Sequence, residues 1–495
     1  MRLHGWLLLL LLLAAAVPGT AWPGVSDEGA TASGPLDSEQ TGQEKPGASA
    51  KKRAAGEEED DDEKGGGRWG FHMGKRPQLD LGPIGFVTFR VKVQAHWRHF
   101  DPELSTADGC GAFADSNGCL FELHRARAGL KGTLFKYLDF EVEREFKDTS
   151  RPLFILKSFF DIQEEEVHNP WRDVYVDFKR WKKFSVQAGK FKLPFSLDEL
   201  SGDTDQDFIV RARLGDLLAP GRDIGIMAHG RFLKKGLYYQ FGLFVHDGDN
   251  ANLSGNLAET LTDTGTGQRT FAGRITGSPF RLWKALPAPL KSIELGAAFT
   301  TSPVPEGVKS LRGRTTSEEL FFPHQFVRGE RRRLGAEFNW NPGRFTLKSE
   351  FARMSEERVK QAISGGDLSP LLTHAWYVSG TWLVTGENKL KLAARRPFRS
   401  WLLWGGPGAL ELALRYDVMR FSSAEHPGRP SRSLRAANVL QTSDRTWTFG
   451  ANWYLNHWTK VQFNSFRERL EDPIRTSIPA ESLYWSHAVR VQFVM

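Results

Sequence analysis

VTFRVKVQAHWR, residues 87–98, alternates between apolar or small side chains at odd positions and polar side chains at even positions. A period of two predicts a β-strand with one apolar face and one polar face. The stretch is long for a strand of a water-soluble domain. Its polar positions are mostly basic or able to become so, with Arg90, Lys92, His96 and Arg98 among them. It therefore predicts either a soluble sheet packed on a protein core, or a wall with lipid outside and a charged lumen inside.

The N-terminus indicates export. It reads MRLHGWLLLLLLLAAAVPGTAW, with a basic Arg2, an apolar run over 7–17, and small residues at Gly19 and Ala21. This pattern predicts a secretory signal peptide over residues 1–21. A membrane anchor is the alternative, but the run is shorter than the roughly 20 residues that a spanning helix needs. No comparably long apolar stretch follows, so an exported chain that spans a membrane would have to do so as a closed β-barrel.

Residues 22–83 form a segment of different composition. They are rich in Gly, Ala, Ser and Glu and contain an acidic run over 57–63, which predicts a disordered periplasmic tail. The run could enter a basic pore as a plug, but a solvated spacer is the favoured interpretation. The segment holds 8 basic and 13 acidic residues. Since the whole chain carries +7 and the signal peptide +1, residues 84–495 carry +11, an excess that fits an anionic partner.

The alternation of the opening stretch recurs fifteen times along residues 84–495, with turns or Gly/Pro/Asp-rich loops between the segments. Sixteen strands in this length leave about 26 residues for each strand with its connection, which suits a large outer-membrane barrel. The sequence therefore predicts an all-β fold, a transmembrane antiparallel β-barrel of about 16 strands. A soluble sandwich of this size would normally divide into domains, and no linker is visible. The fifteen segments are 122–132, 134–146, 172–178, 183–191, 223–232, 237–246, 271–278, 292–300, 333–340, 344–351, 376–386, 409–418, 446–455, 458–463 and 488–495.

Two cysteines, Cys110 and Cys119, are the only ones in the chain and lie in DGCGAFADSNGC. In an exported protein such a close pair predicts a disulfide that closes a loop. Asp108, Asp115 and Asn117 could instead form a weak calcium site, but their spacing matches no known calcium loop, so the disulfide is favoured. No His or Cys cluster has metal-ligand spacing, and neither a metal nor a cofactor is predicted.

Six segments of the folded part are distinctive together: AGKFKLPF (188–195), LLAPGRDIGIMAHG (217–230), WYVSGTWLVTGEN (376–388), LELALRYD (410–417), FGANWYLN (449–456) and RVQF (490–493). In this order they make the chain resemble the phosphate-selective porins of the O and P family over roughly residues 84–495. The resemblance implies a sixteen-stranded, trimeric porin of the bacterial outer membrane. It implies passage of phosphate-type anions along arginine-rich walls and past a lysine-bearing inner loop. The acidic run over 57–63 and the final Met495, in place of an aromatic residue, depart from the family's pattern.

Thirteen basic residues are predicted to line the pore, because the polar face of each strand must face the lumen if the apolar face meets lipid. Guanidinium groups stay charged and match phosphate oxygens with a planar fork. Several such side chains together replace part of the hydration shell of a permeating anion and repel permeating cations. For any one of them the alternative is a salt bridge, such as Arg415 with Glu411 or Arg333 with Glu337. The thirteen are Arg90, Lys92, Arg98, Arg125, Arg127, Lys131, Arg231, Arg274, Arg333, Lys348, Arg415, Lys460 and Arg490.

One connection, SLDELSGDTDQDFIVRARLGDLLAPGR (196–222), is too long for a tight turn. By its position in the family pattern it is predicted to fold inward and narrow the bore. It adds Arg211 and Arg213 to the predicted pore lining. Its first half is acidic, from Asp198 to Asp207, and offers no clear match to the family's lysine.

The sequence thus predicts an outer-membrane diffusion channel for anions, above all phosphate, pyrophosphate or polyphosphate. A general or organic-anion porin and a non-conducting binding barrel are the alternatives. An enzyme is disfavoured because no G-x-S-x-G segment occurs and His229, the best-placed inward histidine, has no serine partner in the sequence. The predicted partners are inorganic phosphate or other small anions, outer-membrane lipid and, from the resemblance, two further copies of the chain in a homotrimer. No nucleic acid is expected.

Overall fold

A computed structural model describes most of the chain from residue 69 onward. The signal peptide, the acidic run, Cys110 and the side chain of Cys119 lie outside the described residues, and with them the predicted disulfide and its calcium alternative. The described ranges are 69–73, 76–99, 119–147, 170–181, 183–233, 236–248, 269–283, 285–306, 310–316, 320–389, 408–423, 435, 437, 439, 441–471 and 483–495.

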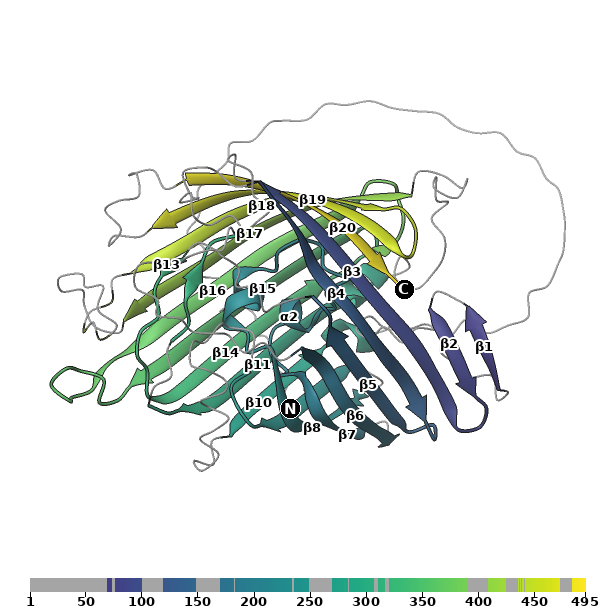
Figure 1. Cartoon of the computed structure of the whole chain (residues 1–495), viewed down its shortest axis with the longest axis horizontal. Helices are drawn as coiled ribbons and strands as arrows, with labels where there is room; N and C mark the ends of the chain where they lie inside the picture. The colour runs from purple at the N-terminus through teal and green to yellow at the C-terminus, as the bar shows by residue number, and fades with distance from the viewer. Residues whose placement is uncertain are drawn as a thin grey trace. The chain divides into compact units, whose positions relative to one another are not determined.

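Sixteen antiparallel strands form a closed barrel, because each strand pairs with the next and the last one, β20, pairs back onto the first, β3 (Figure 1). Each of the sixteen predicted segments overlaps one of these strands, so the predicted fold class is confirmed. The barrel strands are β3 (Gly85–His99), β4 (Cys119–Leu134), β5 (Leu138–Glu145), β6 (Trp171–Trp181), β7 (Phe184–Lys192), β8 (Arg222–Phe232), β9 (Leu237–Phe244), β10 (Thr270–Gly277), β11 (Ile293–Val304), β14 (Gly329–Trp340), β15 (Phe345–Arg358), β16 (Leu368–Leu383), β17 (Ala409–Ser423), β18 (Thr442–Tyr454), β19 (Thr459–Glu471) and β20 (Leu483–Val494).

The two faces of the barrel wall differ as the alternation requires. In β3, Phe89, Val93 and Trp97 are exposed on the outside, whereas Gln94 and Arg98 are buried on the inside. The same parity runs through the other strands, whose outer faces expose large apolar and aromatic side chains. An outward apolar belt around a polar interior is the arrangement of a barrel surrounded by lipid. None of the helices among the described residues is long and apolar enough to cross a membrane.

Two further strands lie in the stretch that was predicted to be a disordered tail. β1 (Trp69–Met73) pairs with β2 (Pro77–Leu81), which in turn pairs with the start of β3. Since β20 reaches only to Lys92 of β3, the first residues of β3 have a free edge, and β2 pairs along it. The prediction for residues 22–83 was therefore wrong in its last part, because the hairpin depends on an edge far away in sequence.

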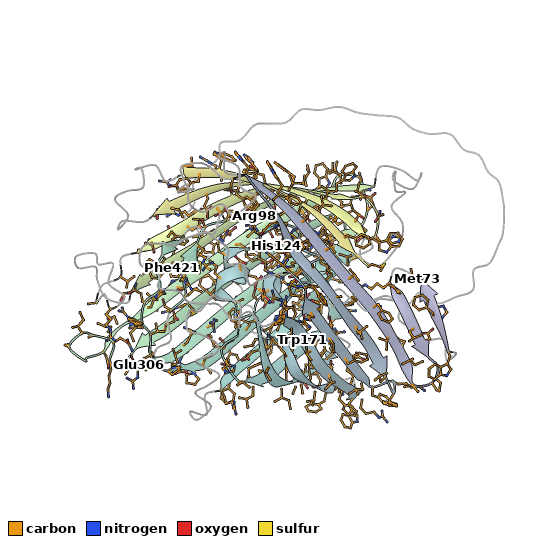
Figure 2. All side chains as sticks on the ribbon, viewed as in Figure 1. Met73, Arg98, His124, Trp171, Glu306 and Phe421 are labelled. Carbon is orange, nitrogen blue, oxygen red and sulfur yellow. The ribbon has the colours of Figure 1, made fainter. Side chains whose placement is uncertain are left out.

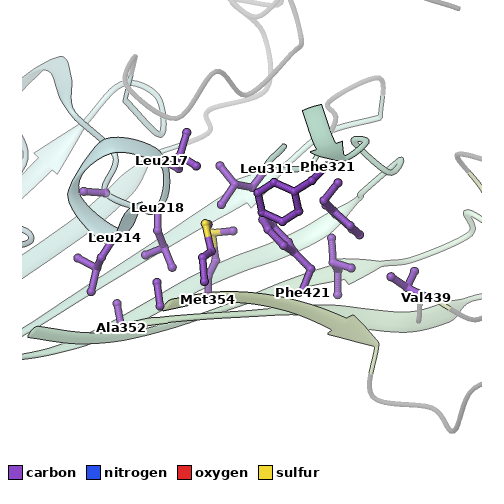
Figure 3. Close-up of a cluster of buried hydrophobic side chains, with 14 of the residues drawn as sticks. Leu214, Leu217, Leu218, Leu311, Phe321, Ala352, Met354, Phe421 and Val439 are labelled. Atoms are coloured by element: carbon purple, nitrogen blue, oxygen red, sulfur yellow. The ribbon is translucent and has the colours of Figure 1, made fainter. Parts of the chain in front are cut away.

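A buried apolar cluster lies inside the barrel, where a charged lumen was predicted (Figure 3). The β7–β8 connection brings α2 (Leu197–Leu200) and the single-turn helix η1 (Leu214–Leu218) into the bore. The β11–β14 connection brings β12 (Gly313–Arg314) and β13 (Leu320–Phe322). Their apolar side chains pack on inward residues of β15 and β17 such as Met354 and Phe421. The β10–β11 connection carries the short helices η3 (Pro279–Leu282) and α4 (Ala288–Lys291).

Candidate functional site

The β7–β8 connection, residues 193–221, is the predicted inner loop, and inward side chains of the wall hold its backbone within the bore. Lys460 donates to the carbonyl oxygens of Thr204 and Gln206, each at 3.0 Å. Arg490 donates to the carbonyl of Ile209 at 2.6 Å. Because buried carbonyl groups require partners, these cations serve as anchors of the loop. The prediction that this connection folds inward is confirmed.

The first turn of the loop is fixed by a carboxylate of the wall. Glu350 on β15 accepts hydrogen bonds from the backbone N–H groups of Leu197 and Asp198 at 2.8 and 2.7 Å, and from the hydroxyl of Tyr377 at 2.7 Å. The first N–H groups of a helix have no partner within the helix, so Glu350 satisfies two of them in α2. The loop therefore enters the bore at a fixed place.

Three arginines surround one carboxylate of the loop. Asp203 accepts from Arg127 of β4 in a short contact and from Arg211 of the loop at 3.0 Å, and Arg125 Nη2 lies 3.7 Å away. Burial alone would raise the pKa of Asp203, but the guanidinium groups of Arg125 and Arg127 hold that pKa well below its usual range. Asp203 is therefore a charged carboxylate within a cationic cradle.

Two lysines bind another carboxylate of the loop, Asp207. Asp207 lies 2.9 Å from Lys348 and 2.5 Å from Lys389, and Lys389 also reaches Glu411 at 2.6 Å. Against the effect of burial, these ammonium groups hold the pKa of Asp207 below its ordinary value. Lys389 was not predicted, because it lies in the turn after β16. The alternation of inward and outward side chains predicts directions only within strands.

A third carboxylate reaches the wall from the β9–β10 connection. Asp247 lies 2.7 Å from Arg331 and accepts two hydrogen bonds from Arg333, at 2.6 and 2.8 Å. Both arginines are fully buried. Arg331 was missed because the predicted strand began at residue 333, although the same alternation continues to residue 331.

A column of acidic side chains on β5 faces the basic side chains of β3 and β4. Glu141 lies 3.2 Å from Arg90 and 3.9 Å from Lys131. Glu143 lies 2.5 Å from Lys92. The alternation that placed the cations inward applies equally to these acids, so the sequence contained the signal for their pairing. This part of the wall is charge-balanced.

The fifteen predicted pore residues are mostly ion-paired rather than free. Arg231 lies over the ring of Tyr238, with 5.3 Å between the guanidinium carbon and the ring centroid, whereas Lys460 and Arg490 bind loop carbonyls. The other twelve each have a carboxylate within 4.0 Å. They are Arg90, Lys92, Arg98, Arg125, Arg127, Lys131, Arg211, Arg213, Arg274, Arg333, Lys348 and Arg415.

The two salt bridges suggested by the sequence, Arg415 with Glu411 and Arg333 with Glu337, are replaced by other pairs. Arg415 binds Asp417 at 3.0 Å instead of Glu411. Arg333 binds Asp247 instead of Glu337, which binds Arg274 at 2.6 Å. The real partners are a residue two positions along the same strand for Arg415, a loop carboxylate for Arg333 and the next strand but one, β14, for Arg274. A spacing of i, i+4 along one strand separates side chains too far for contact.

Three potential metal donors meet on β3 and β4, near the labelled Arg98 and His124 of Figure 2. A β-bulge in β4 opposite Gln94 makes His124 an extra residue, and its ring stacks on His96 at 4.0 Å. Glu122 Oε1 lies 3.3 Å from His124 Nδ1. Arg98 Nη2 already contacts both Glu122 Oε1 and His96 Nδ1, each at 3.3 Å. An internal guanidinium therefore takes the position of a bound cation.

A small pocket lies between the inner loop and the wall formed by β15, β16 and β17. Three cations, Arg211, Lys348 and Arg415, line it together with Tyr377 and Ser379. Two carboxylates of the loop, those of Asp198 and Asp207, also line it. The donors are of the kind that bind phosphate oxygens, and the carboxylates moderate the positive charge.

Comparison with known proteins gives one family and several distant structures. The pattern that defines the family "Phosphate-selective porin O and P" matches residues 108–466. No match was found among curated proteins. The anion-selective porin from Comamonas acidovorans is 13% identical, with a TM-score of 0.46, over 83% of this chain and 99% of that one. The outer membrane channel DcaP of Acinetobacter baumannii is 8% identical, with a TM-score of 0.49, over 83% and 98% of the two chains.

Proposed function

Because this chain belongs to the phosphate-selective porin O and P family, and is thus an outer-membrane channel, we propose that it passes small anions, phosphate among them. The basic excess of residues 84–495 and the inward placement of their arginines and lysines support an anionic cargo. The ion pairs with wall and loop carboxylates support moderate rather than tight binding, which conduction requires.

The observation that carries the proposal is the pocket between the inner loop and the wall. Arg211, Lys348 and Arg415 come from three different elements and converge there beside Ser379. Guanidinium and ammonium groups match the oxygens of a small oxyanion. The neighbouring Asp198 and Asp207 weaken the attraction, so an anion that enters can also leave.

Single-channel recording in chloride, with inorganic phosphate titrated in, tests this proposal. We expect phosphate to reduce the chloride current of the native protein. Lys348→Gln should raise the half-blocking phosphate concentration about tenfold, the ratio expected for losing one charge-assisted hydrogen bond. Arg144→Gln is the matched control, because Arg144 is exposed and stacks on Trp171. An anion-selective channel that phosphate does not block would be a general or organic-anion porin, and a barrel without conductance would be a binding protein.

Export and assembly complete the proposal. We propose that the signal peptide is cleaved after Ala21 and that the mature chain forms a homotrimer. OmpT of Vibrio cholerae in its trimer form is 10% identical, with a TM-score of 0.47, over 83% of this chain and 100% of that one. The mass of the mature protein tests the cleavage site. Native mass spectrometry in detergent tests the trimer, and a monomeric species alone would contradict it.

A further inference from the structure

Asp203 occupies the place of an anionic ligand. Its two oxygens are bound by guanidinium groups from different parts of the chain, Arg127 on β4 and Arg211 on the loop, and Arg125 lies 3.7 Å away. Guanidinium groups recognise carboxylate and phosphate oxygens with the same fork geometry. The three arginines are therefore a site that would suit a small oxyanion if Asp203 were absent.

The cradle remains partly open to the bore. The side chain of Arg125 is 19% exposed, and it also donates a hydrogen bond to the neutral Gln94 at 2.9 Å. Within the described part of the chain, Asp203 is the carboxylate within 4.0 Å of Arg125. Arg127 and Arg211 have further carboxylate partners, Glu145 and Glu199. Arg125 is thus the member of the cradle whose charge is least compensated.

The backbone presents Asp203 to the cradle independently of its ion pairs. The carbonyl of Asp203 accepts a hydrogen bond from Gln94 at 3.3 Å, and the carbonyl of the following Thr204 accepts from Lys460 and from Gln492. A group held by its own chain beside a site has a high effective concentration there. A free anion must compete with it.

We propose that Asp203 is an internal competitor for an oxyanion site formed by Arg125, Arg127 and Arg211. The inference rests on the proposed passage of small anions and deepens it, because it assigns the control of their affinity to one carboxylate. A permeating phosphate binds the cradle only by displacing Asp203, and the site stays weak enough for release.

Asp247 and Asp207, which also lie on connections and bind two cations each, differ from Asp203. Asp247 binds Arg331 and Arg333, which are fully buried and therefore serve the packing of its loop. Asp207 binds the lysines Lys348 and Lys389, which offer point charges rather than a planar fork. Asp207 also lines the proposed pocket, so it is no control. Asp216 of the same loop lies 3.8 Å from Arg213, outside the residues that form the cradle and the pocket, and is the matched control.

The test compares Asp203→Asn, Asp203→Glu and Asp216→Asn in the full-length protein, by phosphate titration of single-channel chloride current. Asp203→Asn should lower the half-blocking phosphate concentration by about tenfold or more, since one ionic competitor is removed. Asp203→Glu, which keeps a carboxylate, and Asp216→Asn should stay within about threefold of the native protein. If Asp203→Asn does not fold, Asp203→Ser is used as the neutral variant in its place. An unchanged or higher half-blocking concentration in the neutral Asp203 variant would overturn the inference.

A second variant separates competition from mere loosening of the loop. Adding Arg125→Gln to Asp203→Asn should remove the gain in phosphate block if the cradle is the binding site. A gain that persists without Arg125 would overturn the inference. The proposed function fails separately, if the native channel and the Asp203 variant both prefer cations in a chloride gradient. If the native channel prefers anions but Asp203→Asn does not strengthen phosphate block, the role of Asp203 as internal competitor is contradicted while the proposed function stands.

Discussion

Arg332 and Arg333 are neighbours in the sequence with opposite environments. The side chain of Arg332 is 63% exposed on the outside of β14, whereas that of Arg333 is fully buried and bound to Asp247. Their difference follows from strand parity alone. At the scale of single residues, many basic side chains on the inner face of this barrel, Arg333 among them, hold a connection in place. Their contribution to ion selectivity is secondary to this structural role.

Arg333→Ala should destabilise the barrel by about 3–5 kcal/mol, because it leaves the buried Asp247 without a full partner set. It also leaves the carbonyl of Leu218 without the hydrogen bond that Arg333 donates at 2.9 Å. Arg332→Ala is the matched control and should change stability by less than about 1 kcal/mol. The thermal midpoint of the folded barrel in detergent measures both. Equal midpoints for the two variants would contradict the assignment of Arg333 as an anchor.

Asp203 and Asp207 should contribute the same amount to the stability of the protein from neutral to mildly acidic pH. Burial opposes ionisation of Asp203 and Asp207, but the neighbouring cations hold both pKa values below normal. Such a group contributes stability above its unfolded pKa of about 4, and the contribution is lost only as the pH falls through the lower folded pKa. The difference in unfolding free energy between the native protein and Asp203→Asn, measured in detergent, should therefore stay constant from about pH 8 to about pH 5 and shrink only below about pH 4. A transition near pH 6 would contradict this.

At the scale of elements, the alternation of the sequence was sufficient to predict sixteen strands and the direction of their side chains, because parity is a local property of extended backbone. The partners of the inward cations were not predictable in the same way. Asp203, Asp207 and Asp247 lie on connections whose positions depend on contacts far away in sequence. The β1–β2 hairpin was missed for the same reason, since its pairing depends on where β20 ends.

Depth in the wall gives a test of the outer face. Leu414 and Leu410 both face outward on β17, with exposures of 43% and 37%, but Leu414 lies nearer the middle of the strand. Leu414→Arg should cost about 2–4 kcal/mol and Leu410→Arg about 0–1 kcal/mol, because the cost of a charge falls from the bilayer centre to its edge. Urea unfolding in lipid vesicles measures the free energy of unfolding. A greater loss for Leu410→Arg would contradict a lipid-facing β17.

At the scale of the whole channel, the inner loop and the β11–β14 connection occupy part of the bore. They join the wall through an apolar cluster on one side and through ion pairs on the other. The remaining wall, from β3 to β8, carries paired charges such as Arg90 with Glu141 and Arg222 with Asp173. Since most inward cations have a carboxylate beside them, we expect a moderate preference for anions rather than strict exclusion of cations.

The reversal potential of the native protein in a potassium chloride gradient tests this account most directly. We predict the sign of a chloride-preferring channel, with a magnitude clearly below that of an ideal anion-selective membrane, because most of the inward cations described have a carboxylate beside them. A reversal potential of the opposite sign, which marks a preference for potassium, would contradict the account.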